Sequence, residues 1–267
     1  MDCERDRLIN YIKSCGIAVN IGKNKARGHK GFFRASDGGY RIDISNSLSD
    51  EEICSVLVHE FIHYVHYCHD INMENIEFML PEQNDILTEE LLRITVNSIK
   101  KKSISPLYSM KQNADIEVKN IFSLLKKKYP DIKLGKPCKV LENILNKSNM
   151  KYLLKHDNVA VYEGFTKKLY RVSDVDNYDI NEDAALYIRL KSKQRLQRRI
   201  NSRISKLNRY YNRPSELLAR SFECYIFDNE KFKELAPNLS KIYNETIKLC
   251  KIKELSGLCK ILNYNFT

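Results

Sequence analysis

Several features that would place this chain in a special class are missing from its sequence. No apolar run reaches the 18 or more residues that a membrane-spanning helix requires, and charged residues make up 30% of the chain. The first residues mix acidic and basic side chains, whereas a secretory signal peptide has a basic segment followed by an apolar one. We therefore expect a soluble, cytoplasmic protein without a membrane span.

The eight cysteines form no metal-binding or disulfide pattern. They are scattered along the chain, and no two of them make a CxxC pair. Without such pairs a zinc knuckle is not expected, and without an export signal neither are disulfides, so we expect reduced thiols. Internal repeats and low-complexity tracts are also missing.

What the chain does have is enough apolar material for a core and an excess of positive charge. Its 267 residues are 43% hydrophobic, which is sufficient for one well-packed domain with an insertion or for two small domains. The net charge of +11 and the pI near 9.1 favour anionic partners. Charge alone does not choose among nucleic acid, phospholipid headgroups and acidic polypeptides.

The spacing of apolar residues predicts a small sheet followed mainly by helices. Short apolar runs punctuated by glycine predict two or three strands within residues 13–44. Ser49 and Glu52 form a capping-box pattern ahead of an amphipathic helix that should extend to about Cys68. Beyond it we expect helices at 83–102, 112–128 and 138–147, a hairpin at 159–172, helices at 181–210 and 215–227, and one or two more within 232–260.

Residues 59–63 have the sequence HEFIH and lie on the helix that follows the capping box. Because positions four apart on a helix face nearly the same way, His59 and His63 can bind one zinc ion. Glu60 is placed to act as the general base on a zinc-bound water. A catalytic zinc needs three protein ligands, so this helix leaves one ligand missing.

The sequence offers two candidates for the third ligand. His69 completes the HExxHxxGxxH spacing of metzincins, but His66 stands where that motif has the glycine that allows the chain to turn back. The distant candidate is Glu216, which begins a predicted helix in a gluzincin arrangement. The residues by themselves leave both candidates open.

The segment YYNRPSELLARSFECYI, residues 210–226, carries a family resemblance. It resembles the ExxA(E/R)xFxxY segment of anthrax-lethal-factor-like peptidases and of peptidase-like domains in phage and mobile-element proteins, and HEFIH resembles their HEFGH. The resemblance implies that Glu216 is the third zinc ligand. It also implies that Tyr210, or Tyr211 as the alternative, stabilises the oxyanion.

The resemblance covers about residues 43–69 and 208–225 and leaves the middle of the chain unmatched. Several relatives have an acid four residues after the third ligand, a position that Arg220 occupies here. Glu223, on the same helix face as Glu216, either accepts a hydrogen bond from a ligand histidine or forms an ion pair with Arg220, and we favour the ion pair.

The resemblance implies a zinc-dependent endopeptidase of the zincin group, with one Zn²⁺ per chain. We expect an α+β fold with an N-terminal half at 1–75 holding the sheet and the HExxH helix. A mainly helical insertion with a hairpin follows at 76–180, and a C-terminal helical lobe at 181–267 supplies Glu216. A protein or peptide substrate should lie along the edge strand of the sheet, which we place near Tyr40–Ser45.

A second function class comes from the basic helix at 189–209. No acidic residue lies between Asp183 and Glu216, whereas Lys and Arg accumulate there. This pattern predicts either a surface for an anionic partner or simply a solvated helix face. The alternatives to an active peptidase are thus a basic nucleic-acid-binding protein and an inactive zincin that serves as an interaction module. Neither the basic helix nor an inactive role accounts for Glu60 within HExxH.

Overall fold

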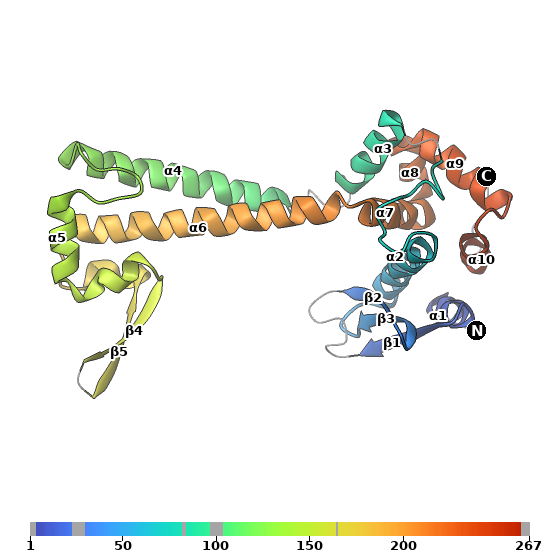
Figure 1. The fold of residues 1–267 in the computed structure, drawn as a ribbon, viewed down its shortest axis with the longest axis horizontal. Helices are drawn as coiled ribbons and strands as arrows, with labels where there is room; N and C mark the ends of the chain where they lie inside the picture. The colour runs from blue at the N-terminus through green and yellow to red at the C-terminus, as the bar shows by residue number, and fades with distance from the viewer. Residues whose placement is uncertain (1–3, 23–29, 82–83, 97–103, 164, 263–267) are drawn as a thin grey trace. The chain divides into compact units, whose positions relative to one another are not determined.

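The computed structural model describes residues 4–22, 30–81, 84–96, 104–163 and 165–262 (Figure 1). The fold is α+β, mostly helical with a small sheet, as the sequence predicts. The chain forms two compact units: unit 1 consists of residues 1–101 together with 208–267, and unit 2 consists of residues 102–207. The three-part division predicted from the sequence stays a prediction. Among the helices in the described ranges, none combines the length and apolar character needed to cross a bilayer.

Unit 1 contains a three-stranded sheet. Its strands are β1 (Ile17–Gly22), β2 (Gly31–Ser36) and β3 (Gly39–Ser45), in the order β1-β3-β2. β3 pairs with β1 in parallel and with β2 antiparallel. The prediction that Tyr40–Ser45 is an edge strand is therefore wrong, because β3 lies in the centre with its backbone groups paired on both sides. β2 is an edge of the sheet and contacts α2.

Helix α2 (Asp50–His69) is the central element of unit 1. The predicted capping box is confirmed: the Glu52 amide donates to Ser49 Oγ at 3.3 Å, and the Ser49 amide donates to Glu52 Oε2 at 3.2 Å. From Leu57 to His66 every residue is buried, because α2 packs against β2, β3, α1 and α7. A helix surrounded in this way holds its polar residues away from bulk water.

The remaining helices of unit 1 complete the core around α2. Helix α1 (Glu4–Ser14), which is not predicted from the sequence, buries Leu8 and Ile12 and packs against α2 and α10. After α7 (Pro214–Phe227), the described residues form three helices, where the sequence predicted one or two. They are α8 (Asn229–Leu235), α9 (Pro237–Lys248) and α10 (Lys253–Ile261), and α3 (Asp85–Thr95) packs against α7, α8 and α9. Part of the predicted 83–102 helix lies outside the described residues.

Unit 2 has its own hydrophobic core. It contains α4 (Ser105–Lys128), α5 (Lys139–Lys147), the 3-10 helices η2 (Asn149–Leu154) and η3 (Val172–Asn177), and most of α6 (Glu182–Tyr211). The predicted hairpin is confirmed as β4 (Asn158–Glu163) paired antiparallel with β5 (Thr166–Arg171). This hairpin extends away from α5 and α6 (Figure 1).

Candidate metal centre

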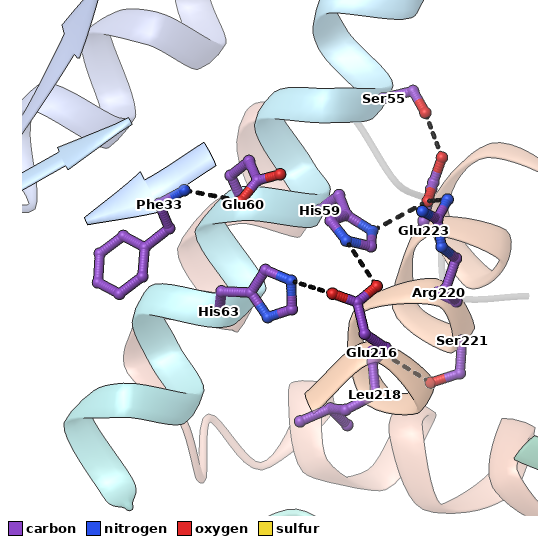
Figure 2. Close-up of polar contacts among 10 residues, drawn as sticks. All are labelled: Phe33, Ser55, His59, Glu60, His63, Glu216, Leu218, Arg220, Ser221 and Glu223. Atoms are coloured by element: carbon purple, nitrogen blue, oxygen red, sulfur yellow. Dashed lines mark hydrogen bonds and ion pairs between the residues drawn. The ribbon is translucent and has the colours of Figure 1, made fainter. Parts of the chain in front are cut away.

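Helices α2 and α7 bring three predicted site residues together (Figure 2). His59 and His63 lie one turn apart on α2, with ring centroids separated by 4.8 Å. Glu216 lies in the first turn of α7, which begins at Pro214. Nε2 of His59 lies 3.5 Å from Glu216 Oε2, and Nε2 of His63 lies 3.3 Å from Glu216 Oε1. All three side chains are buried.

The three groups have the geometry and chemistry of a metal-binding set. Each offers one donor atom, and these atoms all lie within 4.8 Å of one another. A tetrahedron with bonds of about 2.0–2.1 Å has edges of about 3.3–3.4 Å, close to the two nitrogen–oxygen separations. Within the described ranges, no other three His, Cys, Asp or Glu side chains converge in this way.

The hydrogen bonding of this group also fits a cation site. Glu216 Oε2 and His63 Nδ1 are buried and have no hydrogen-bond partner among the described residues. Burial opposes the imidazolium form of His59, but Glu216 and Glu223 outweigh burial and raise the pKa of His59 to about 9. Burial likewise opposes ionisation of Glu216, yet the adjacent histidines hold its pKa far below the usual range. A metal ion bound here would replace a proton that these groups otherwise share.

Glu223 lies behind His59, on the side away from Glu216 (Figure 2). Its Oε2 is 3.3 Å from His59 Nδ1 and 3.3 Å from a terminal nitrogen of Arg220, and Ser55 Oγ donates to Oε1. The two roles expected for Glu223, acceptor for a histidine and ion-pair partner of Arg220, thus occur together. Burial raises the pKa of Glu223, but His59, Arg220 and Ser55 together lower it.

Glu60 lies next to the three donors but outside the donor set. Its Oε2 accepts a hydrogen bond from the Phe33 amide of β2 at 2.9 Å. Gly31 permits this close approach, because a Cβ at that position would lie 2.3 Å from Val56 Cγ1 and 3.0 Å from Glu60 Cγ. The edge strand therefore holds a carboxylate beside the group of three without tying it to His59 or His63.

The two candidate tyrosines lie at the end of α6, in residues that belong to unit 1. Burial, together with the neighbouring carboxylates of Glu216 and Glu60, raises the pKa of the Tyr210 hydroxyl. Tyr211 packs edge-on against the Tyr210 ring, with centroids 5.2 Å apart. The carboxylates that raise this pKa belong to the site, which favours Tyr210 as the tyrosine nearest to it in charge.

His69 is not brought to the group of three. It stacks on Phe78, with ring centroids 4.5 Å apart and planes 5° from parallel. The chain after α2 is organised by other bonds: His66 Nε2 lies 2.7 Å from the Asn75 carbonyl oxygen, and the Asp70 carboxylate accepts from three following backbone amides. His66 and Asp70 thus have a structural role, because their hydrogen bonds fix the segment that follows α2.

Three residues at this site were not identified from the sequence. Gly31 and Phe33 act through their backbones, so only the position of β2 against α2 reveals them. Ser55 had a weak signal, since it lies four residues before His59 and hence on the same face of α2.

No protein-family model matches the chain, and neither a curated protein nor a solved structure matches it significantly.

Proposed function

We propose that unit 1 is a zinc-dependent endopeptidase of the gluzincin-like zincin type, with one Zn²⁺ held by His59, His63 and Glu216. The observation that carries the proposal is the convergence of two imidazoles and one carboxylate at 3.3–3.5 Å, with Glu60 beside them and outside the donor set. Three protein donors leave a fourth position for water or substrate, which is the pattern of a catalytic centre rather than a structural one.

The donor chemistry favours zinc over other common metals. Mg²⁺ and Ca²⁺ prefer sites built from oxygen atoms, whereas imidazole nitrogen suits zinc and its transition-metal neighbours. The site is also buried and has three donors rather than six. When bound, zinc would polarise a substrate carbonyl and lower the pKa of a water molecule.

Two side chains of this chain would handle protons and charge. Glu60 would take the proton of the attacking water and later return it to the leaving amine, and the Phe33 amide holds one of its carboxylate oxygens in place. The Tyr210 hydroxyl would donate a hydrogen bond to the oxyanion that develops on the substrate. A tyrosine hydroxyl has an ordinary pKa of about 10, so this proton is present at neutral pH.

We assign the substrate to the edge of the sheet next to Glu60, which is β2 and not the central β3. The Ser45 amide donates to the Lys30 carbonyl oxygen, so alternate residues from Lys30 onward face β3. Gly31, Phe33 and Ala35 therefore direct their backbone groups away from β3. The Phe33 amide is taken by Glu60, so an extended peptide would pair with the other outward backbone groups of this row and add a strand to the sheet.

Metal analysis tests the ligand set. We expect about one zinc per purified chain, with severe loss of zinc affinity in Glu216→Ala and His63→Ala and none in His69→Ala. The His69→Ala variant serves as the matched control, because it removes a histidine from the same helix. A zinc-free protein, or equal and mild losses in Glu216→Ala and His69→Ala, would refute the ligand assignment.

Cleavage assays separate an active enzyme from an inactive interaction module. A mixture of unstructured proteins incubated with the zinc-loaded chain should yield new N-termini at defined positions. Glu60→Gln should abolish cleavage while zinc content and thermal unfolding stay unchanged, because Glu60 lies outside the donor set. Full zinc binding with no cleavage by the natural sequence would instead favour the interaction module.

A further inference from the structure

The excess positive charge of the chain lies in unit 2. Residues 102–207 contain 23 Lys and Arg against 11 Asp and Glu, a net charge of +12, whereas the rest of the chain has 22 against 23, a net charge of −1. Unit 2 is thus a cationic module joined to a nearly neutral unit that holds the candidate metal centre. Nothing in the proposed peptide hydrolysis requires this charge.

Much of the charge on helix α6 is used inside unit 2. Arg195, for example, donates to the Asp157 carboxylate and to the carbonyl oxygens of Leu153 and Leu154. The basic helix at 189–209 has nine Lys and Arg residues. Five of them contact a carboxylate or a carbonyl oxygen within unit 2: Arg189, Lys191, Lys193, Arg195 and Arg199. These contacts hold the unit together, so the helix is not an open anion-binding surface along its whole length.

The β4–β5 hairpin has one packed face and one exposed face. Val159, Val161 and Tyr170 lie on the packed face and contribute to the core of unit 2. Because side chains alternate along a strand, the residues that precede and follow these on each strand point to the opposite face of the hairpin. The exposed face is formed by Asn158, Ala160, Tyr162, Lys167, Leu169 and Arg171, all of which are exposed.

The six residues of the exposed face combine a ring with two cations, and none of the six is acidic. Tyr162, of which 70% is exposed, lies directly across from Lys167, and Phe165 in the connecting turn is fully exposed. Lys167 and Arg171 lie four residues apart on one strand, about 13 Å along it. Within the described residues, the Lys167 and Arg171 side chains have no ion-pair partner, and the large exposed rings beside them indicate a binding surface rather than a role in folding.

We propose that this exposed hairpin face binds single-stranded nucleic acid. Tyr162 and Phe165 would stack on bases, while Lys167 and Arg171 would contact phosphates, and the net charge of unit 2 would attract the strand. Exposed rings favour a single strand over a duplex, because the bases of a duplex are already stacked on one another. A membrane surface fits less well, since Lys167 beside Tyr162 and Thr166 beside Phe165 interrupt the apolar tip with polar groups.

Fluorescence anisotropy with labelled 20-nucleotide oligo(dT) and oligo(U) tests the proposal on the full chain. We expect binding that weakens with salt. Tyr162→Ala with Phe165→Ala should weaken it at least tenfold without changing the salt slope, because no charge is removed. Lys167→Gln with Arg171→Gln should make the slope of log K against log salt shallower by about 1.4, as two fewer phosphates are neutralised.

Matched controls lie on α4, where Lys119, Lys126 and Tyr108 are exposed. Lys119→Gln with Lys126→Gln, and separately Tyr108→Ala, should leave the affinity within twofold. His63→Ala should bind the oligonucleotides normally, so a failure of the proposed peptidase would not affect this test. The proposal is overturned by absence of binding at low salt, by equal losses in the α4 controls, or by binding only to vesicles that contain phosphatidylserine.

Discussion

Glu223 gives the most discriminating prediction about the candidate metal centre. Its carboxylate lies 3.3 Å from His59 Nδ1, and such partners of a ligand histidine typically affect metal affinity by about 10- to 100-fold. The distance exceeds the roughly 2.7–2.9 Å of a strong charge-assisted hydrogen bond, which places the expected effect near the lower limit. We therefore expect Glu223→Ala to weaken zinc binding about 10-fold, or about 1.4 kcal/mol.

Competition with a chromogenic chelator at pH 7 measures this change directly. Glu223→Gln keeps an oxygen that can accept from His59 Nδ1, so it should lose less zinc affinity than Glu223→Ala. The pair of variants therefore separates the hydrogen bond to His59 from the packing of the side chain. Glu230→Ala, an exposed acid on α8, controls for the loss of one negative charge. If folded Glu223→Ala and Glu223→Gln both bind zinc within twofold of the natural sequence, then Glu223 does not position His59.

Three further predictions concern residues that position β2, the start of α9 and the arginines of α6. Gly31→Ala should displace β2 by about 1 Å and reduce the proposed peptidase activity about 100-fold with zinc content unchanged. Gly38→Ala should be silent, because a Cβ at that position would have no neighbour closer than 3.8 Å. Glu90 accepts three hydrogen bonds at the start of α9, so in urea denaturation Glu90→Ala should cost about 3 kcal/mol and exposed Glu89→Ala almost nothing. For Asp157, burial raises the pKa but hydrogen bonds and arginines lower it further. Its stabilisation is therefore fully present above the unfolded pKa of about 3.9 and is lost as the pH falls through the lower folded pKa, so the Tm difference from Asp157→Asn should shrink progressively in melts below that pH.

Prediction from the sequence works best where the pattern is local. The capping box at Ser49 and the spacing of His59 and His63 involve residues within one or two helical turns, and both occur in the structure as expected. The β4–β5 hairpin is similarly local, with strands joined by a short turn. Helix α1 was missed because its apolar residues are few among charged ones, and only packing against α2 and α10 reveals its buried face.

Strand order shows where local patterns stop being informative. The apolar runs of β1, β2 and β3 are evident in the sequence, but the order β1-β3-β2 depends on which strands pair across the sheet. The sequence therefore pointed to Tyr40–Ser45 as the edge, although that strand is central. The same limit applies to α6, whose basic stripe gave no sign that most of it is paired inside unit 2.

The sequence by itself determined that two histidines and a glutamate share one short helical motif, because helical periodicity places them on neighbouring faces. It left the third donor open between His69 and Glu216. Only the tertiary structure placed Glu216 beside both histidines and Glu223 behind His59, a contact between residues 164 positions apart. Such contacts depend on how α7 packs against α2, and packing of distant segments is a property of the whole folded core rather than of any local pattern.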